Sequence, residues 1–391
     1  MKNMLKNIVE VIYNWPAETF IQRHVEALIS VGFPIQILAR HAINLLKQNA
    51  SISTESQKFS SYILPNFNHL GYAGKLSSLR YLTSKSMRVV GNISIGDRVV
   101  LGYFECLQPD LIHFHDASLA ASMQWIPRLL GVPYTLSLRG SDIQVLPNQS
   151  AEQKNSTISA LQNARRIHAV CDCLGGGAKK IAGSQLAPQT IYTTIPIPDK
   201  LPQWLGAKNK EELHFVSSGR LMWRKGFSQL LVAVRYLLDR GESVKLTIVG
   251  NGPEIDFILY MRNILNLESH ISLVGKLNYK EFSQLLSNAH AYVQSSIAEG
   301  LSNALVEAMA NGVPVFATDV DGTGEVIEDG VTGFLLPPLQ PEKWADILGR
   351  ARDIELMEQV RTIAYQQACE RFSPEKHAKD FIHFYRQALN A

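Results

Sequence analysis

Residues 295–338 read SSIAEGLSNALVEAMANGVPVFATDVDGTGEVIEDGVTGFLLPP, and this stretch decides the fold. Its first serines end a strand, a short turn follows, and Ser302 is placed to cap a helix over 303–311. Gly312 and Pro314 then end the helix and start another strand. A strand, a helix and a second strand in succession are typical of a βαβ unit, which is found in parallel sheets.

The same alternation runs through the chain in two series. The first series contains five predicted strands, at 8–13, 35–40, 111–115, 134–138 and 167–171. The second contains five more, at 213–219, 244–250, 271–275, 291–296 and 313–318. Between them, PIPDKLPQWLGAKNKEE (196–212) has the prolines and charges of a linker. We therefore predict two doubly wound, Rossmann-like α/β domains, 1–203 and 204–375, facing a cleft where ligands bind.

The last residues, 376–391, have the pattern of an amphipathic helix. Phe381, Phe384, Tyr385 and Leu389 fall on one of its faces. An apolar face of this size must pack against another element, and we consider the first domain as the place where this helix docks.

The composition describes an ordinary globular chain of 391 residues, with 46% hydrophobic and 19% charged residues. No apolar run approaches the roughly 18 to 20 residues that span a bilayer. The first apolar segment carries Glu10, which favours a strand over a signal peptide. The four cysteines lack the spacing of a zinc site, and the basic residues form no recognised nucleic-acid module. We therefore expect a cytoplasmic protein without nucleic-acid partners.

Charge is uneven between the two halves of the chain. Residues 1–200 hold 19 Lys and Arg against 12 Asp and Glu, whereas residues 201–391 hold 19 against 23. The basic half either faces an anionic partner or is one end of a dipolar surface. The candidate basic segment in this half is 75–90, which has the pattern of an amphipathic helix. That helix either rests peripherally on an anionic membrane carrying a lipid-linked acceptor or packs its apolar side into the core, and we favour the core.

The start of the helix at Ser302 is suited to bind a diphosphate. Unpaired N–H groups and the positive end of the helix dipole meet there, at the carboxyl end of a parallel strand. Glu299 precedes the helix and Glu307 lies one to two turns inside it. With phosphates at Ser302 and Asn303, the two carboxylates would accept hydrogen bonds from sugar hydroxyls on either side. Taken alone, the same pattern also describes a surface helix with two solvated glutamates.

Two further stretches reach the same edge of the second sheet. SSGRLMWRKGF (217–227) follows its first strand and brings Arg220 and Lys225, which can neutralise a leaving diphosphate without a metal ion. LTIVGNGPE (246–254) contains a tight turn, whose glycines allow a base or ribose to approach the backbone closely. An oxidoreductase is disfavoured, because no G-x-G-x-x-G turn follows the first strand of either domain.

These three stretches, in this order and at these spacings, resemble the second domain of glycosyltransferase family 4, the retaining enzymes of the GT-B fold. The resemblance covers residues 213–338. It implies that Arg220 and Lys225 bind the donor diphosphate, that Glu299 contacts the transferred sugar and that Glu307 binds the ribose. It also implies further donor contacts, by Ser302, Asn303 and Ala304 at the phosphates and by Gly250, Asn251 and Gly252 at the base.

The first domain resembles the same family more thinly, in the version found among polysaccharide-assembly transferases. NWPAETFIQRHVEALISVGFPIQILAR (14–40) looks like the family's opening turn and helix, which would place Glu18 and Thr19 at the cleft. PDLIHFHDASLA and GVPYTLSLRGSDI resemble its HxH strand end and its His-Gly-x-x-Asp segment, here with Arg139 in place of the histidine. Arginine cannot act as a base, although it stabilises negative charge.

Three other residues are candidates on the acceptor side: His113, His115 and Asp142. Asp142 follows Arg139 and Gly140 in the segment described above. The two histidines alternate along a strand, and we expect them to point to opposite faces, one toward the cleft and the other toward the core. Packing in the core is the alternative for either one.

The resemblance implies a retaining, metal-independent hexosyltransferase without further cofactors. It would move a sugar from a UDP- or GDP-sugar to the hydroxyl of a glycan or lipid-linked acceptor, and no carboxylate nucleophile of the hydrolase kind stands out. A non-catalytic nucleotide-sugar-binding subunit is the alternative, favoured by Arg139 alone. Another is a different GT-B enzyme. A nucleotide-sugar epimerase is disfavoured by the paired Arg220 and Lys225 with Glu299 and Glu307, and a phosphorylase is disfavoured because the sequence shows no lysine site of the pyridoxal type.

Overall fold

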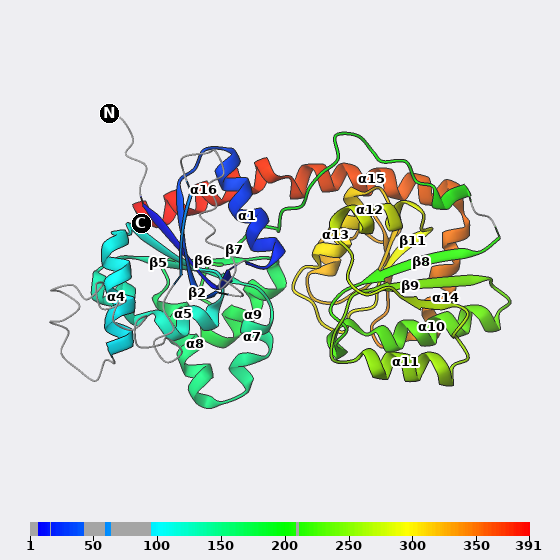
Figure 1. The fold of residues 1–391 in the computed structure, drawn as a ribbon, viewed down its shortest axis with the longest axis horizontal. Coiled ribbons are helices and arrows are strands. Elements are labelled where there is room, and N and C mark those ends of the chain that lie inside the picture. Colours follow the sequence, from blue (N-terminus) through cyan, green and yellow to red (C-terminus); the bar gives the residue numbers. More distant parts are fainter. Residues whose placement is uncertain (1–6, 16, 43–58, 64–94, 209–210) are drawn as a thin grey trace. The chain divides into compact units, whose positions relative to one another are not determined.

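The computed structural model describes residues 7–15, 17–42, 59–63, 95–208 and 211–391. The chain divides into two compact units, Met1–Ile191 with His377–Ala391, and Tyr192–Lys376. Each unit contains one parallel sheet with helices packed on it (Figure 1). The predicted class, two doubly wound α/β halves, is confirmed. The basic segment 75–90, considered above for membrane contact, lies outside the described residues.

The first unit contains a seven-stranded sheet in the order β3-β2-β1-β4-β5-β6-β7. All its registered strand pairs are parallel. Its strands are β1 (Ile8–Trp15), β2 (Ile35–Ala42), β3 (Phe59–Ile63), β4 (Leu111–Phe114), β5 (Tyr134–Leu138), β6 (Arg166–Ala169) and β7 (Gln189–Thr190). From β1 the sheet first grows through β2 to β3. It then grows on the other side of β1, through β4 to β7. Because the order reverses at β1, the connecting helices cover both faces of the sheet.

The helices of this unit divide between the two faces of the sheet. They are α1 (Thr19–Ser30), α4 (Ile95–Leu107), α5 (Ala117–Met123), α6 (Trp125–Leu130), α7 (Ser141–Gln144), η2 (Leu146–Asn148), α8 (Ala151–Asn163), α9 (Asp172–Ala182) and α16 (Pro374–Asn390). In Figure 1, α1 and α16 lie on one side of the sheet, and α5 and α8 lie on the other. The helices α5 and α6 follow each other directly, and the chain turns between them at Gln124.

The last helix does dock on the first unit. Phe381, Phe384, Tyr385 and Ala388 on α16 are buried in one core with α1, β1 and β2. Leu389 packs against the same core. Burial of large apolar side chains stabilises this contact by about 1.5–3 kcal/mol each. The amphipathic pattern of 376–391 thus identified both the helix and its partner.

The second unit contains a six-stranded parallel sheet in the order β10-β9-β8-β11-β12-β13. Its strands are β8 (Leu213–Ser218), β9 (Val244–Val249), β10 (Ile271–Leu273), β11 (Ala291–Gln294), β12 (Val315–Thr318) and β13 (Phe334–Leu336). Five of these were predicted, and β13 was not, because its three residues, Phe-Leu-Leu, are too short for a periodic pattern.

Helices cover both faces of the second sheet and bury one core on each. They are η3 (Gly206–Lys208), η4 (Trp223–Lys225), α10 (Phe227–Asp239), α11 (Ile255–Ile264), α12 (Tyr279–Ser287), α13 (Asn303–Ala310), η5 (Thr323–Glu325), α14 (Pro341–Gly349), η6 (Arg350–Arg352) and α15 (Ile354–Phe372). One core joins the sheet to α10 and α14, and the other joins it to α12 and α13. Both cores also take side chains from α15.

Candidate functional site

The helix α13 begins where the sequence predicted. Ser302 is its N-cap, and the Ser302 hydroxyl accepts a hydrogen bond of 3.3 Å from the backbone N–H of Leu305. The first N–H groups of a helix have no acceptor within the helix, so those of Asn303 and Ala304 are available to a ligand. Asn303 Oδ1 is buried without a hydrogen-bond partner among the described residues. This end of α13 has the chemistry of an anion site.

Glu299 and Lys225 form an ion pair beside this helix end. Lys225 Nζ donates to Glu299 Oε2, and Ser296 Oγ donates to the same oxygen at 3.3 Å. The two charged side chains keep 22% and 16% of their surface exposed, respectively, so the pair is shielded but open to a ligand. The lysine ammonium has three donors, and this pair therefore leaves two of them for phosphate oxygens.

Backbone contacts between two loops bring Lys225 to Glu299, which is 74 residues away in the chain. The N–H of Ile297 donates to the carbonyl oxygen of Arg224 at 2.7 Å, and Ser295 Oγ donates to that of Lys225 at 2.8 Å. A Cβ on Gly226 would lie 2.0 Å from the carbonyl oxygen of Ser295. Only glycine fits at this contact, where the backbone also has a φ of +60°.

Arg220 lies after the end of β8 and is exposed. It forms no ion pair with any residue that the structure describes. The structure therefore brings together Lys225, Glu299 and the start of α13, whereas Arg220 shares their sheet edge without contacting a carboxylate.

Glu307 is half-buried on α13 and acts electrostatically on the same strand ends as Glu299. Burial raises the pKa of Tyr292, and the carboxylates of Glu299 and Glu307 add to the rise. Hydrogen bonding with Ser218 opposes it. Tyr292 lies on β11, and its hydroxyl is 3.2 Å from Ser218 Oγ at the end of β8. The two glutamates thus flank the carboxyl ends of these central strands.

The glycines of the Gly250–Asn251–Gly252 turn lie against the backbone that follows β8. A Cβ on Gly250 would lie 1.9 Å from the carbonyl oxygen of Gly219, and one on Gly252 would lie 2.3 Å from that of Leu221. The close approach is therefore to the chain's own backbone after β8. Asn251 is exposed beside this contact, and its Oδ1 accepts from the N–H of Gly252 at 2.7 Å.

In the first unit, Glu18 and Thr19 lie at the start of α1. Glu18 is the N-cap residue, but its side chain makes no capping hydrogen bond. Its carbonyl oxygen accepts from the N–H groups of Ile21 and Gln22. Both Glu18 and Thr19 are exposed, so they remain available to a ligand.

The prediction for His113 and His115 was wrong in its geometry. Residues two apart on a strand point to the same face, and the two imidazole rings are 4.8 Å apart. Both are buried. His113 Nδ1 and Nε2 lie 2.8 Å and 3.0 Å from the hydroxyls of Thr135 and Ser137 on β5. Burial lowers the pKa of His113 well below its ordinary value, so it is a neutral core residue.

Arg139 and Asp142 shape the loop after β5. Asp142 is fully buried and accepts hydrogen bonds from the backbone N–H groups of Arg139, Gly140 and Ala117. Burial raises the pKa of Asp142 to about 7, and the carboxylate of Asp116 adds to the rise, while these three bonds oppose it. The guanidinium of Arg139 lies over the Phe20 ring at 4.9 Å. Asp142 thus supports the backbone that carries Arg139.

Sequence reasoning missed a buried polar cluster behind this loop, which we call the Glu10 cluster: Glu10, His24, His115, His377 and Tyr385. Glu10 Oε2 is 2.8 Å from His115 Nε2, and Glu10 Oε1 is 3.0 Å from His24 Nε2. Burial alone would raise the pKa of Glu10, but His24 and His115 hold it well below its ordinary value. A glutamate within an apolar strand was the available signal, because a buried charge requires partners.

Three members of the Glu10 cluster have the composition of a metal site. The candidate ligand atoms of Glu10, His24 and His115 lie within 4.8 Å of one another. However, Arg139 NH2 lies 3.0 Å from His115 Nδ1 and can only donate. His115 Nδ1 is therefore an acceptor and Nε2 carries the proton, which it donates to Glu10. This hydrogen-bonding pattern favours a proton-filled network over a metal centre.

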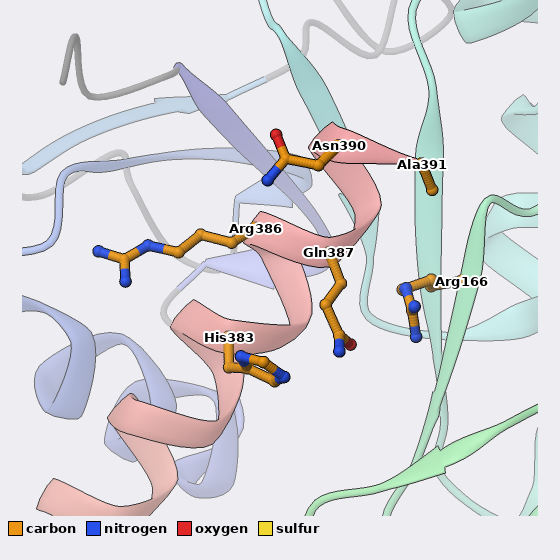
Figure 2. A pocket seen from close by; sticks show the side chains of 6 residues that line it. All are labelled: Arg166, His383, Arg386, Gln387, Asn390 and Ala391. Atoms are coloured by element: carbon orange, nitrogen blue, oxygen red, sulfur yellow. The ribbon is translucent and has the colours of Figure 1, made fainter.

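A separate surface pocket of about 420 Å³ lies along the outer side of α16 (Figure 2). It is lined by Arg166, His383, Arg386, Gln387, Asn390 and Ala391. None of the residues predicted to act in binding or catalysis lines it. No helix in the described part of the chain is both long enough and apolar enough to cross a membrane.

Comparison with known proteins gives this arrangement a family context. Residues 203–367 match the family described as glycosyl transferases group 1. A teichuronic acid biosynthesis glycosyltransferase of Bacillus subtilis is 28% identical over 294 residues, which cover 72% of this chain and 71% of that protein. An amylovoran biosynthesis glycosyltransferase of Erwinia amylovora is 24% identical over 367 residues, covering 85% and 87%.

Solved structures agree on the fold. An Anabaena protein in complex with UDP and glucose is similar with a TM-score of 0.73 and 16% identity, over 97% of this chain and 99% of that chain. Sucrose-phosphate synthase from Thermosynechococcus elongatus is similar with a TM-score of 0.76 and 16% identity, over 98% of each chain. The GT-B fold and the resemblance to group 1 glycosyltransferases are therefore confirmed.

Proposed function

We propose that this chain is a retaining glycosyltransferase that moves a sugar from a nucleoside diphosphate to the hydroxyl of a glycan or a lipid-linked acceptor. The second unit would bind the donor and the first the acceptor. The observation that carries the proposal is the Lys225–Glu299 ion pair beside the start of α13. The two bacterial relatives are named for polysaccharide synthesis, and this supports a glycan acceptor.

Diphosphate binding follows from the charges at this strand edge. The N–H groups of Asn303 and Ala304 would bind phosphate oxygens, and Lys225 would add its two remaining donors. Arg220 has no carboxylate partner among the described residues. Its guanidinium would bind the diphosphate through two parallel N–H···O hydrogen bonds. These groups stabilise the charge that develops on the leaving phosphate, and the leaving group needs no metal ion for this.

The two glutamates would then bind the two ends of the donor. Glu299, beside Lys225, accepts hydrogen bonds from hydroxyls of the transferred sugar, and Glu307 accepts from the ribose. The acceptor hydroxyl attacks the anomeric carbon on the face that the diphosphate leaves and passes its proton to a leaving phosphate oxygen. The anomeric configuration is retained because bond making and bond breaking share one face. Arg139 is our candidate for stabilising negative charge on the acceptor side.

A ligand screen followed by a transfer assay tests this function. Thermal shift with UDP, GDP and their common sugar conjugates should raise the unfolding midpoint for one nucleotide family, by mass action on the folded state. Transfer from the bound donor to glycan and lipid-linked acceptors should give a product with the donor's anomeric configuration by NMR, with and without EDTA. Inversion, or strict dependence on Mg²⁺, would refute the mechanism, and donor binding without turnover would favour a non-catalytic binding subunit.

A further inference from the structure

Three hydrogen bonds hold the turn that carries Glu299 against the end of β12 and the segment that follows it. Thr318 Oγ1 donates to the carbonyl oxygen of Ser296 at 2.5 Å. The N–H of Glu299 donates to Asp321 Oδ2 at 2.7 Å. The N–H of Gly322 donates to the carbonyl oxygen of Gly300 at 3.2 Å. The turn is therefore fixed before, at and after the residue whose carboxylate meets Lys225.

Asp321 holds its place in this clamp at a conformational cost. Its φ is +45°, in the left-handed region that glycine adopts without penalty. A residue with a Cβ is strained there, although aspartate tolerates the region better than most residues. Strain of this kind persists only where the surrounding structure demands the residue. The side chain supplies the acceptor for the Glu299 N–H, which glycine lacks.

Glu299 is consequently held from two directions. Its backbone is bound by Asp321, and its carboxylate is bound by Lys225 and Ser296. The peptide N–H that Asp321 binds lies within the same residue as the functional carboxylate. A shift of that peptide group would displace the carboxylate.

We propose that Asp321 is a positioning residue, which orients the Glu299 carboxylate toward the transferred sugar through the backbone of Glu299. This rests on the proposed function, in which Glu299 binds the sugar of the donor. Asp321 acts through an acceptor oxygen at a fixed position, so asparagine can replace it. Glycine and alanine, which lack that oxygen, cannot.

The test uses a substitution that separates stability from positioning. Asp321→Gly removes the acceptor but also relieves the left-handed strain, so its unfolding midpoint should equal or exceed that of the wild type. Its kcat should nevertheless fall about 10- to 100-fold, since displacement by about 1 Å of a positioning group has this effect. Asp321→Asn should retain most of the activity. Leu339→Gly is the matched control, because Leu339 has a φ of +58° and is 62% exposed; it should relieve strain and leave kcat unchanged.

A binding measurement distinguishes this proposal from the proposed function itself. By calorimetry, Asp321→Gly should weaken binding of the nucleotide sugar found in the screen while binding of the bare nucleoside diphosphate stays unchanged. This readout needs no turnover, so it still tests Asp321 if the wild type proves to be a non-catalytic binder. Wild-type kcat and sugar affinity in Asp321→Gly would overturn the proposal. So would an Asp321→Asn variant as impaired as Asp321→Gly, or a loss of activity that merely follows a loss of stability.

Discussion

The hydroxyl of Tyr385, on the last helix, donates a hydrogen bond of 2.8 Å to Glu10 Oε1, in the middle of the first strand. Both residues are fully buried. The contact joins positions 375 residues apart in the chain, and it completes the Glu10 cluster. The docking of α16 on the first unit therefore includes a buried polar contact among its aromatic side chains.

Removing this hydroxyl should destabilise the first unit. Tyr385→Phe preserves the ring but leaves a buried carboxylate with one donor fewer, and hydrogen bonds to charged groups contribute about 1.5–3 kcal/mol. The expected result is a lower urea midpoint at pH 7.5. Tyr236→Phe is the control, because Tyr236 is 41% exposed on α10, and its midpoint should not change. Equal midpoints for Tyr385→Phe and the wild type would show that the tyrosine does not support Glu10.

The same cluster predicts acid sensitivity. Burial lowers the pKa of His115 to about 4, despite the opposing effect of Glu10, whereas an unfolded histidine titrates near about 6.5. Between these values the unfolded chain binds a proton that native His115 does not, so stability falls as pH falls, by up to about 1.4 kcal/mol per pH unit for each such group. His113 and His168, whose pKa values burial also lowers, act in the same direction.

Glu10 extends this loss to lower pH. Its native pKa is depressed, so its contribution is present above its unfolded value and disappears as pH falls through the native value. Urea unfolding from pH 7.5 to pH 4.5 should therefore show a falling midpoint for the first unit below about pH 6.5. A midpoint that stays constant over this range would contradict buried, neutral histidines in this unit.

The parts of the site that follow from local pattern were predictable, and those that depend on contacts between distant loops were not. The alternation of elements around 295–338 was enough to place Ser302 at the start of α13. The approach of Lys225 to Glu299 depends on Gly226 fitting against Ser295, a contact across 69 residues that no periodicity encodes. Glu10 was visible as a charge in an apolar strand. However, Tyr385, which donates to Glu10, and His377, which bonds to its partner His24, come from the far end of the chain.

Lys225 should be essential for transfer and dispensable for folding. Lys225→Ala removes a cation from the leaving phosphate, and the loss of one such group costs about 10²- to 10³-fold in kcat. Lys245→Ala is the matched control, since Lys245 lies on β9, is 55% exposed and pairs with Glu212 at 3.4 Å. Steady-state kinetics with unfolding curves for both variants would decide. Wild-type turnover in Lys225→Ala would remove the donor-site assignment.

The Gly250 turn should tolerate no side chain, with or without a ligand. In Gly250→Ala the new Cβ would meet the carbonyl oxygen of Gly219 at 1.9 Å, and the φ of +140° is unfavourable for alanine. A large fall in the unfolding midpoint of the second unit is expected. Gly241→Ala separates the two causes, because its φ of +85° is also positive but no atom lies within 4 Å of the added Cβ. If both variants lost stability equally, the contact with Gly219 would not matter.

Glu299 and Glu307 should differ in which part of the donor they bind. Glu307→Gln should weaken binding of the bare nucleoside diphosphate, because the proposed partner of Glu307 is the ribose. Glu299→Gln should leave that affinity unchanged, weaken binding of the complete nucleotide sugar and lower kcat, because its proposed partner is the transferred sugar. Calorimetry with both ligands measures the difference, with the exposed Glu268→Gln as the unaffected control. The reverse pattern would exchange the two roles, and equal effects on both ligands would show that the two carboxylates act on the diphosphate through their charge alone.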